Sequence, residues 1–316
     1  MKRLLKTWIL PISIAIGIAG YLVYVSIPSL DFTHHAVAEF VNWANPALLF
    51  CMLLLSFCKV NFGDIKVRRW MLIMLLVQVV GCVLFLVPLL LFPHSSLRLL
   101  FEGGVLMFVC PTATAAVVVS YKLGGKIENV IAYTIVSNIA ASVLFPLVIS
   151  LITVQSFSAL VLSFLKILLH VFPILILPMI TAAFLRRFFP RCHSYLARNT
   201  EVAFYIWAVT LGFCMGISTK ALLESDISWQ MLVALSFVVL FCFDMQFRIG
   251  HRIGKKHRDR VSGGQTLGQK NTSFAIWLAY TFMTPVTALA SSIYIIYQNC
   301  FNSWQLYKQE KERHDC

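Results

Sequence analysis

The chain has 316 residues, of which 59% are hydrophobic and only 12% are charged. Soluble proteins carry roughly 25% charged residues, so this composition excludes a soluble globular fold. The net charge of +13 must therefore be explained by where the basic residues lie relative to apolar segments.

Long apolar stretches recur along the whole chain. Most are roughly 17 to 25 residues long, which is enough to cross a bilayer as a helix. The first is too long for the apolar part of a signal peptide, so we interpret it as a membrane span. We predict an all-α polytopic membrane protein with ten transmembrane helices, at about 7–27, 43–58, 71–93, 99–121, 127–152, 161–185, 201–219, 229–247, 261–282 and 285–304.

The lysine and arginine residues test this assignment, because cytoplasmic loops of membrane proteins are enriched in them. With a cytoplasmic N-terminus, 22 of the 26 fall in inner segments and only Arg98 and Lys220 fall in outer ones. The other two, Lys166 and Lys270, lie within spans. This asymmetry predicts that both termini are cytoplasmic. It also accounts for the positive charge, so no nucleic-acid partner is expected.

No pattern in the sequence indicates an enzyme or a metal centre. The nine cysteines contain no CxxC pair, and the eight histidines contain no HExxH spacing. Most of the cysteines lie in or beside spans, where cysteine behaves as a small apolar residue. We therefore expect no cofactor and no catalytic residue.

Lys270 is the charged residue that this assignment buries deepest. It lies near the middle of its span, which at ~1.5 Å per residue is roughly 15 Å from either surface. The other charges inside spans have simpler explanations, because Lys166 can reach the interface and Asp244 can pair with Arg248 one turn later. A charge at the bilayer centre marks a candidate functional site.

The fourth and ninth stretches contain helix-breaking residues. Pro111 lies in the middle of the fourth, where it removes an intrahelical hydrogen bond, and Thr112 and Thr114 can satisfy the freed carbonyl groups. The ninth contains the polar segment VSGGQTLGQKNTS, in which we expect breaks at Gly263, Gly264 and Gly268. A broken helix is tolerated at membrane depth where it lines a cavity enclosed by protein.

These two stretches occupy the same position in each half of the chain. Paired interruptions of this kind indicate a secondary transporter built from inverted repeats. We predict one membrane domain over 1–316, with a first five-helix repeat at about 7–152, a second at about 161–304 and a cytoplasmic tail at 305–316. The broken fourth and ninth spans would cross near the midplane, where substrate and coupling ions bind.

Three segments resemble the bile acid:sodium symporter family. The segment CPTATAAVVVSYKLGGKIENVIAYTIVSNIAASVLFPL resembles the family's CPGGTASNV pattern and the motifs that follow it. LGQKNTSFAIWLA resembles the family's EVGMQNSGLALA, and NPALLFCMLLLSFCKVNFGDIK is similar to its second span and the following loop. Gln78 stands about thirty residues before the Cys-Pro pair, as a glutamine does in the family. The resemblance implies a transporter of organic anions such as bile acids, steroid sulfates or small carboxylates.

The chain departs from the family where the resemblance implies sodium ligands. Family members hold two sodium ions through oxygen-bearing side chains at the crossing of spans four and nine. Thr134 and Gln78 retain the family's residues. The other ligand positions carry Ala116, Val117, Val130, Thr266 and Lys270. The resemblance therefore implies that sodium binding is lost and that no metal is bound.

Lys270 stands where the family places a sodium ligand, so its ammonium group could replace the bound cation. The residues expected around this substrate and coupling site are Lys270, Gln78, Thr266, Gln269, Asn271, Thr114, Thr134 and Asn138. Burial favours the neutral form of an amine, so Lys270 could instead carry a proton. It could also contact an anionic substrate, or serve only as a latch between the crossing helices.

We therefore predict a sodium-independent secondary transporter of a small organic anion that works by alternating access. A sodium-coupled symporter, or a receptor or assembly protein that kept the fold, remains the alternative. The family's arsenite carriers fit less well, because they place a cysteine after the proline of span four, whereas Cys110 precedes Pro111 here. Short loops and the absence of targeting features predict a bacterial inner membrane. The sequence does not indicate an oligomeric state.

Overall fold

The computed structural model describes residues 2–59, 66–153 and 156–314, and this part of the chain is all-α. It contains fourteen α-helices and two short 3-10 helices, η1 (Pro28–Thr33) and η3 (Pro285–Thr287). Six helical segments of the described chain are long and apolar enough to cross a membrane. The protein is therefore a polytopic membrane protein, as its composition predicts.

Seven long helices each correspond to one predicted span. They are α1 (Lys2–Val25), α2 (His34–Phe57), α3 (Arg69–Leu91), α6 (Ile127–Thr153), α10 (Thr200–Leu223), α11 (Trp229–Lys256) and α14 (Ala288–His314). Helix α14 extends beyond the predicted end of the last span, so the expected tail at 305–316 is helical as far as His314.

The fourth and ninth predicted spans are each divided into two helices. The fourth consists of α4 (Arg98–Val109) and α5 (Ala115–Lys122), and the ninth consists of α12 (Arg260–Gly268) and α13 (Thr272–Phe282). Pro111 lies in the first break and Gly268 ends α12 at the second. The predicted interruptions of both spans are thus confirmed.

A further division, which the sequence analysis did not predict, occurs in the sixth span. It separates α7 (Phe157–Leu175) from α8 (Leu177–Phe188), and the short helix α9 (Pro190–Arg198) follows. Pro173 lies within the last turn of α7, and Pro178 lies in the first turn of α8. Proline lacks the backbone N–H that would continue the helical hydrogen bonding, which explains the interruption at Ile176.

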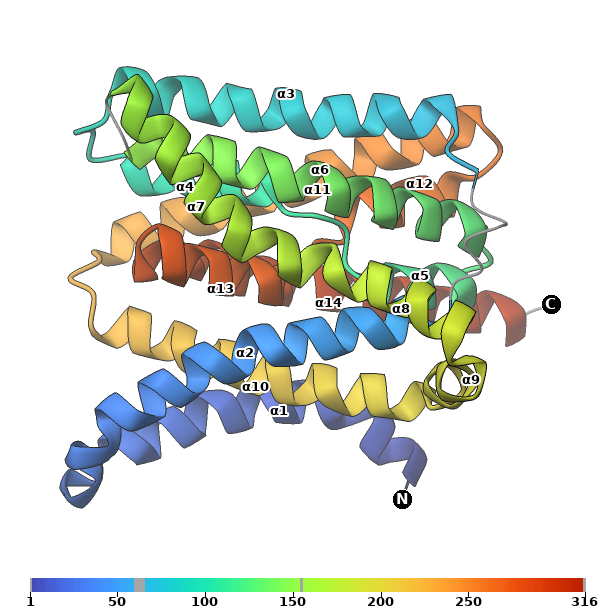
Figure 1. The fold of residues 1–316 in the computed structure, drawn as a ribbon, viewed down its shortest axis with the longest axis horizontal. Helices are drawn as coiled ribbons and strands as arrows, with labels where there is room; N and C mark the ends of the chain where they lie inside the picture. Colours follow the sequence, from blue (N-terminus) through green and yellow to red (C-terminus); the bar gives the residue numbers. More distant parts are fainter. Residues whose placement is uncertain (1, 60–65, 154–155, 315–316) are drawn as a thin grey trace.

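The helices form two groups that lie side by side (Figure 1). One group contains α3 to α6 and α11 to α14, and the other contains α1, α2, α8, α9 and α10. Helix α7 connects them, because it packs against α6 of the first group and against α2 and α8 of the second. The first group contains both broken spans.

Gly263 and Gly264 do not break the ninth span, contrary to the expectation from the sequence, because α12 continues through both. They allow α12 to pack closely on α11. A Cβ atom on Gly263 would lie 2.4 Å from the carbonyl oxygen of Gly250, and one on Gly264 would lie 2.1 Å from the His251 ring. Side chains at these two positions would separate the helices.

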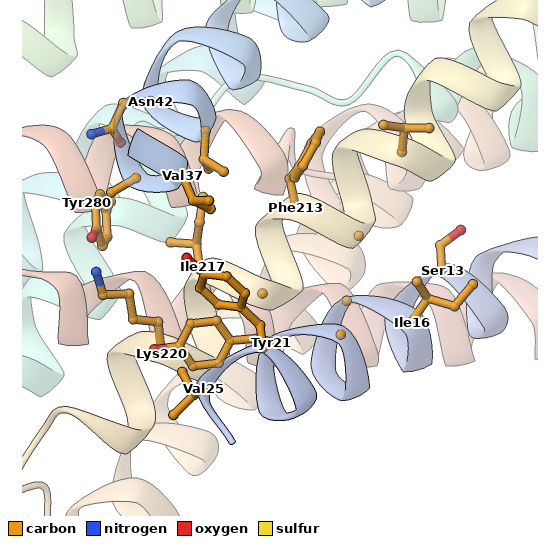
Figure 2. Close-up of a pocket in the computed structure, with 18 of the residues that line it drawn as sticks. Ser13, Ile16, Tyr21, Val25, Val37, Asn42, Phe213, Ile217, Lys220 and Tyr280 are labelled. Carbon is orange, nitrogen blue, oxygen red and sulfur yellow. The ribbon is translucent and has the colours of Figure 1, made fainter. Parts of the chain in front are cut away.

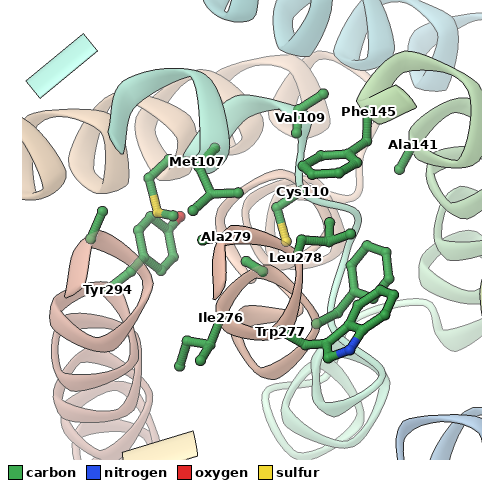
Figure 3. Close-up of a cluster of buried hydrophobic side chains, with 14 of the residues drawn as sticks. Met107, Val109, Cys110, Ala141, Phe145, Ile276, Trp277, Leu278, Ala279 and Tyr294 are labelled. Atoms are coloured by element: carbon green, nitrogen blue, oxygen red, sulfur yellow. The ribbon is translucent and has the colours of Figure 1, made fainter. Parts of the chain in front are cut away.

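Buried apolar side chains surround the broken spans. Figure 3 shows Met107 and Val109 of α4 near Leu278 of α13 and Tyr294 of α14, with Cys110 among them. All of these residues belong to the main hydrophobic cluster of the described chain. The two breaks are therefore embedded in tightly packed protein rather than exposed to lipid.

Candidate functional site at the helix crossing

The two breaks meet and pair through their main chains. Thr112 and Lys270 form an antiparallel β-bridge. On one side of it, the Ala113 amide donates to the Gln269 carbonyl at 3.0 Å, and on the other the Asn271 amide donates to the Pro111 carbonyl at 2.9 Å. Polar backbone groups inside a membrane need a protein partner, and each break supplies partners for the other.

Side chains satisfy further backbone groups of the crossing. The Thr112 hydroxyl donates to the Thr266 carbonyl at 2.6 Å, and the Thr112 amide donates to the Ser137 hydroxyl at 3.1 Å. The Tyr294 hydroxyl donates to the carbonyl of Gly268 at 2.6 Å, at the end of α12. The crossing is thus held by hydrogen bonds that do not involve the side chain of Lys270.

Lys270 lies in the second break and is 0% exposed. Its backbone amide donates to the Gln298 side-chain oxygen at 3.2 Å. Its Nζ atom is buried and has no hydrogen-bond partner in the described part of the chain. An amine held in this way can act as a cation for a bound anion, or as a group that gains and releases a proton.

Gln78 and Thr134 were expected around the lysine side chain, but among the described residues neither forms a hydrogen bond with it. The Gln78 amide nitrogen donates to the carbonyls of Phe108 and Cys110, at 3.3 Å each, and its oxygen accepts from the Tyr133 hydroxyl at 2.6 Å. The Thr134 hydroxyl donates to the Val130 carbonyl of its own helix at 2.8 Å. Gln78 therefore satisfies carbonyl groups at the end of α4, and Thr134 bonds to the backbone of its own helix.

Two other expected site residues also bond locally. The Thr266 hydroxyl donates to the carbonyls of Ser262 and Gly263, at 2.8 and 3.1 Å. The Asn271 side-chain oxygen accepts from the Phe274 amide at 3.3 Å and caps α13, while its Nδ2 atom is buried and has no partner in the described chain. That nitrogen is a second polar group at the crossing with unused bonding capacity.

The remaining expected residues differ in their surroundings. Asn138 of α6 is buried, and neither atom of its amide has a partner within the described residues. Thr114 precedes α5, makes no side-chain capping bond and is partly exposed. Of the eight residues expected at this site, Thr114, Gln269, Lys270 and Asn271 lie in the breaks, and Gln78 bonds to the carbonyl of Cys110 in the first break.

Three of the positions where the resemblance implies sodium ligands carry apolar residues. Ala116 and Val130 are completely buried, and Val117 is partly buried. No group of three or more potential metal-binding side chains (His, Cys, Asp or Glu) occurs in the described chain. The residues of the two breaks, 110–114 and 269–271, include no carboxylate.

A row of amide side chains lies near Lys270, and the sequence analysis identified only Gln269 among them. Gln269 Nε2 donates to Asn302 at 3.0 Å and also to Gln265, which in turn donates to Gln305 at 2.8 Å. The residues on α14 are Gln298, Asn302 and Gln305, spaced i, i+4 and i+7. This spacing places them on one helix face, so the pattern could have been recognised.

Glu102, a buried carboxylate of α4, was also missed. It is 3% exposed, and it accepts from Arg98 Nε at 2.7 Å and from the Thr287 hydroxyl at 2.6 Å. These bonds connect the start of α4 to η3, at the end of the molecule opposite the chain termini (Figure 1). The i, i+4 spacing of Arg98 and Glu102 in an apolar helix was the available signal.

A comparison to known families identifies the family of this chain. The model of the sodium bile acid symporter family matches residues 46–225, more than half of the chain. The match includes α4, α5 and the first break and ends before α11. A search of curated proteins finds no match. The chain thus belongs to the sodium bile acid symporter family and is a membrane transporter.

Proposed function

We propose that this protein is a secondary-active transporter of an organic anion, that it works by alternating access without sodium, and that Lys270 takes the place of the coupling cation. Membership of the family implies a secondary transporter of bile-acid-like solutes. The finer proposal rests on one observation, the fully buried Lys270 Nζ without a hydrogen-bond partner in the described chain, at the crossing of the two breaks.

The geometry favours this role over that of a simple latch. The crossing is already joined by two hydrogen bonds between the main chains of the breaks and by the Thr112 side chain. The Lys270 side chain adds no hydrogen bond to them. A buried amine without a partner destabilises the fold, so a purely structural residue at this position would be better replaced by an apolar one.

The charge of the site favours an anion as substrate. Sodium needs several oxygen ligands, usually including a carboxylate, but Ala116 and Val130 are apolar and Thr266 uses its hydroxyl within its own helix. A protonated Lys270 would provide a positive charge that a carboxylate or sulfate could neutralise. Bile-acid-like compounds, steroid sulfates and small carboxylates all satisfy this requirement.

The proposed transport cycle uses ten membrane crossings arranged as two inverted repeats, at about 7–152 and 161–304. Their broken fourth and ninth spans would form the site near the midplane. Arg98 begins α4 and Lys220 lies in the last turn of α10, and both helix ends lie opposite the chain termini in Figure 1. The segments expected on the inner side contain 22 of the 26 lysine and arginine residues. The positive-inside rule then places both termini in the cytoplasm, in our proposal at a bacterial inner membrane.

Uptake into proteoliposomes tests this proposal. Purified protein would be supplied with taurocholate, a steroid sulfate or a small dicarboxylate, with either sodium or potassium outside at equal ionic strength. We expect uptake of at least one of these anions at the same rate in both salts, and no difference in melting temperature between the salts. Acceleration or stabilisation by sodium would support the sodium-coupled alternative. Binding without uptake would support a receptor.

Lys270→Arg separates a proton carrier from a fixed cation. Arginine keeps a positive charge but does not release its proton at physiological pH. We expect the arginine variant to fold and to lose uptake, because the cycle requires the site to change its charge. The measurement is the initial uptake rate from pH 5.5 to 8.5, with melting temperature as the test of folding. An arginine variant with the wild-type rate and pH profile would leave only the fixed-cation role.

A further inference from the structure

A large groove lies between α1, α2 and α10, apart from the crossing (Figure 2). Its volume is about 1000 Å³, which is at the upper end of the range for pockets that bind small molecules. Its lining comes from these three helices, including His34 at the start of α2, and from Tyr280 of α13. None of the lining residues belongs to either break.

Glycines form the floor of this groove. A Cβ atom on Gly17 would lie 2.3 Å from the carbonyl oxygen of Gly212, so α1 and α10 touch there without intervening side chains. Gly20 lies one turn further along α1, and a Cβ atom on it would meet no atom within 4 Å. The space above Gly20 is therefore part of the groove and is not filled by another side chain.

The rim of the groove is apolar and continuous with the surface that faces lipid. Ile16 and Val25 of α1 and Val37 of α2 line the groove, and all three are among the exposed large hydrophobic residues. Exposed apolar side chains on helices of this kind contact the hydrocarbon of the bilayer. An apolar molecule can thus enter the groove sideways from the membrane.

One end of the groove carries two opposite charges. Lys220 and Glu224 lie one turn apart near the end of α10, and both line the groove. Their charged atoms are 3.9 Å apart, and the side chains are 31% and 61% exposed. A pair this long and this exposed contributes little stability, so either charge can exchange its partner for a ligand. In Figure 2 the Lys220 amine points toward Asn42 and Tyr280.

We propose that the groove binds a zwitterionic phospholipid of the surrounding membrane. The acyl chains lie over the glycine floor, the phosphate contacts Lys220, and the positively charged amine of the headgroup contacts Glu224. A purely anionic amphiphile satisfies Lys220 but brings a second negative charge beside Glu224. The adjacent positive and negative charges at the end of an apolar groove are the complement of a phosphoethanolamine headgroup.

Lipid retention by a groove-filling variant tests this proposal independently of transport. Gly20→Leu fills the open space above the floor and meets no protein atom within 4 Å at its Cβ. Ala19→Leu is the matched control, since Ala19 is exposed on the same helix and does not line the groove. Full-length protein would be exposed to vesicles of equal parts phosphatidylethanolamine and phosphatidylglycerol, re-extracted in mild detergent and examined by native mass spectrometry.

We expect wild-type protein and Ala19→Leu to retain phosphatidylethanolamine and Gly20→Leu to lose it, with unchanged helical content. Glu224→Gln should shift retention toward phosphatidylglycerol, and Lys220→Gln should reduce retention of both lipids. Equal retention of the two lipids by wild-type protein, or undiminished retention by Gly20→Leu, would overturn the proposal. Displacement of the lipid by taurocholate at a stoichiometric amount would also overturn it, because the groove would then be a second substrate site.

Discussion

Lys270 combines complete burial with an amine that makes no hydrogen bond in the described chain. An ionised group without a partner in a protein interior is opposed by several kcal/mol of lost hydration. The main-chain pairing of Thr112 with Lys270 is independent of that side chain. At the scale of one residue, the lysine therefore lowers the stability of the fold and is not needed to hold the two breaks together. A residue kept for function rather than for structure is expected to behave in this way.

Replacement of Lys270 by methionine should raise stability and abolish uptake. Methionine has a similar length and no charge, so it removes the burial penalty without opening a cavity. We expect the free energy of unfolding to rise by at least about 1 kcal/mol, measured as denaturant resistance in detergent. Lys166→Met, on an exposed position of α7, is the control and should change neither property. A large loss of stability in Lys270→Met would instead indicate that the amine acts as a latch.

Single residues in an apolar chain were predictable to different degrees. Lys270 could be identified because a charge at membrane depth is rare, and Pro111 because a proline in the middle of a predicted span removes a helical hydrogen bond. The bonding partners could not, because they depend on which helices are adjacent. Gln78 was expected near Lys270, yet its amide bonds to the carbonyls of Phe108 and Cys110. Sequence spacing contains no information about that choice.

At the scale of elements, glycine has two opposite roles in α12. Gly268 ends the helix, whereas Gly263 allows the helix to pack on Gly250 and Gly254 of α11. The sequence analysis predicted a break at each glycine. In a sequence, a glycine that interrupts a helix cannot be distinguished from one that packs against another helix. The deciding information lies in the neighbouring helix.

The positions of the helices along the chain follow from the lengths of the apolar stretches. They were predicted well, since that signal is local.

Gly263→Ala should destabilise the packing of α12 on α11. The new Cβ atom would lie 2.4 Å from a backbone oxygen of Gly250, and a helix backbone cannot move aside as a flexible side chain can. We expect a loss of roughly 1–3 kcal/mol in unfolding experiments in detergent. The same substitution at Gly20, whose Cβ would meet nothing within 4 Å, should be neutral or stabilising, because alanine favours helix. Equal effects at the two positions would contradict the close packing.

At the scale of the whole molecule, polar contacts join the two groups of helices where α10 packs on α13 and α14. One of them joins the hydroxyl groups of Ser218 of α10 and Ser292 of α14, which lie 2.5 Å apart and are buried. Glu102, in contrast, connects α4 and η3 within the first group. If transport requires the groups to move against each other, the serine contact must break in each cycle while the Glu102 contact persists.

A disulfide between the two groups should stop transport. In the double variant Ser218→Cys/Ser292→Cys, oxidation would join α10 to α14, and we expect uptake to fall to background and to return after reduction. Ser292→Cys alone is the control. It shows whether the new cysteine reacts with the native Cys214, which lies one turn from Ser218 on α10. Uptake that continues after mass spectrometry has confirmed the disulfide would show that this interface does not move.

The pairing of the two breaks has a consequence for how such a protein changes over evolutionary time. The bonds from Ala113 to Gln269 and from Asn271 to Pro111 join main-chain atoms, and a main-chain bond persists whichever side chain its residue carries. Side chains at the crossing can therefore be exchanged one at a time while these main-chain bonds remain. The driving ion and the substrate can then change during evolution while the fold is retained. A lysine can likewise be introduced at the crossing of the breaks without a change of fold.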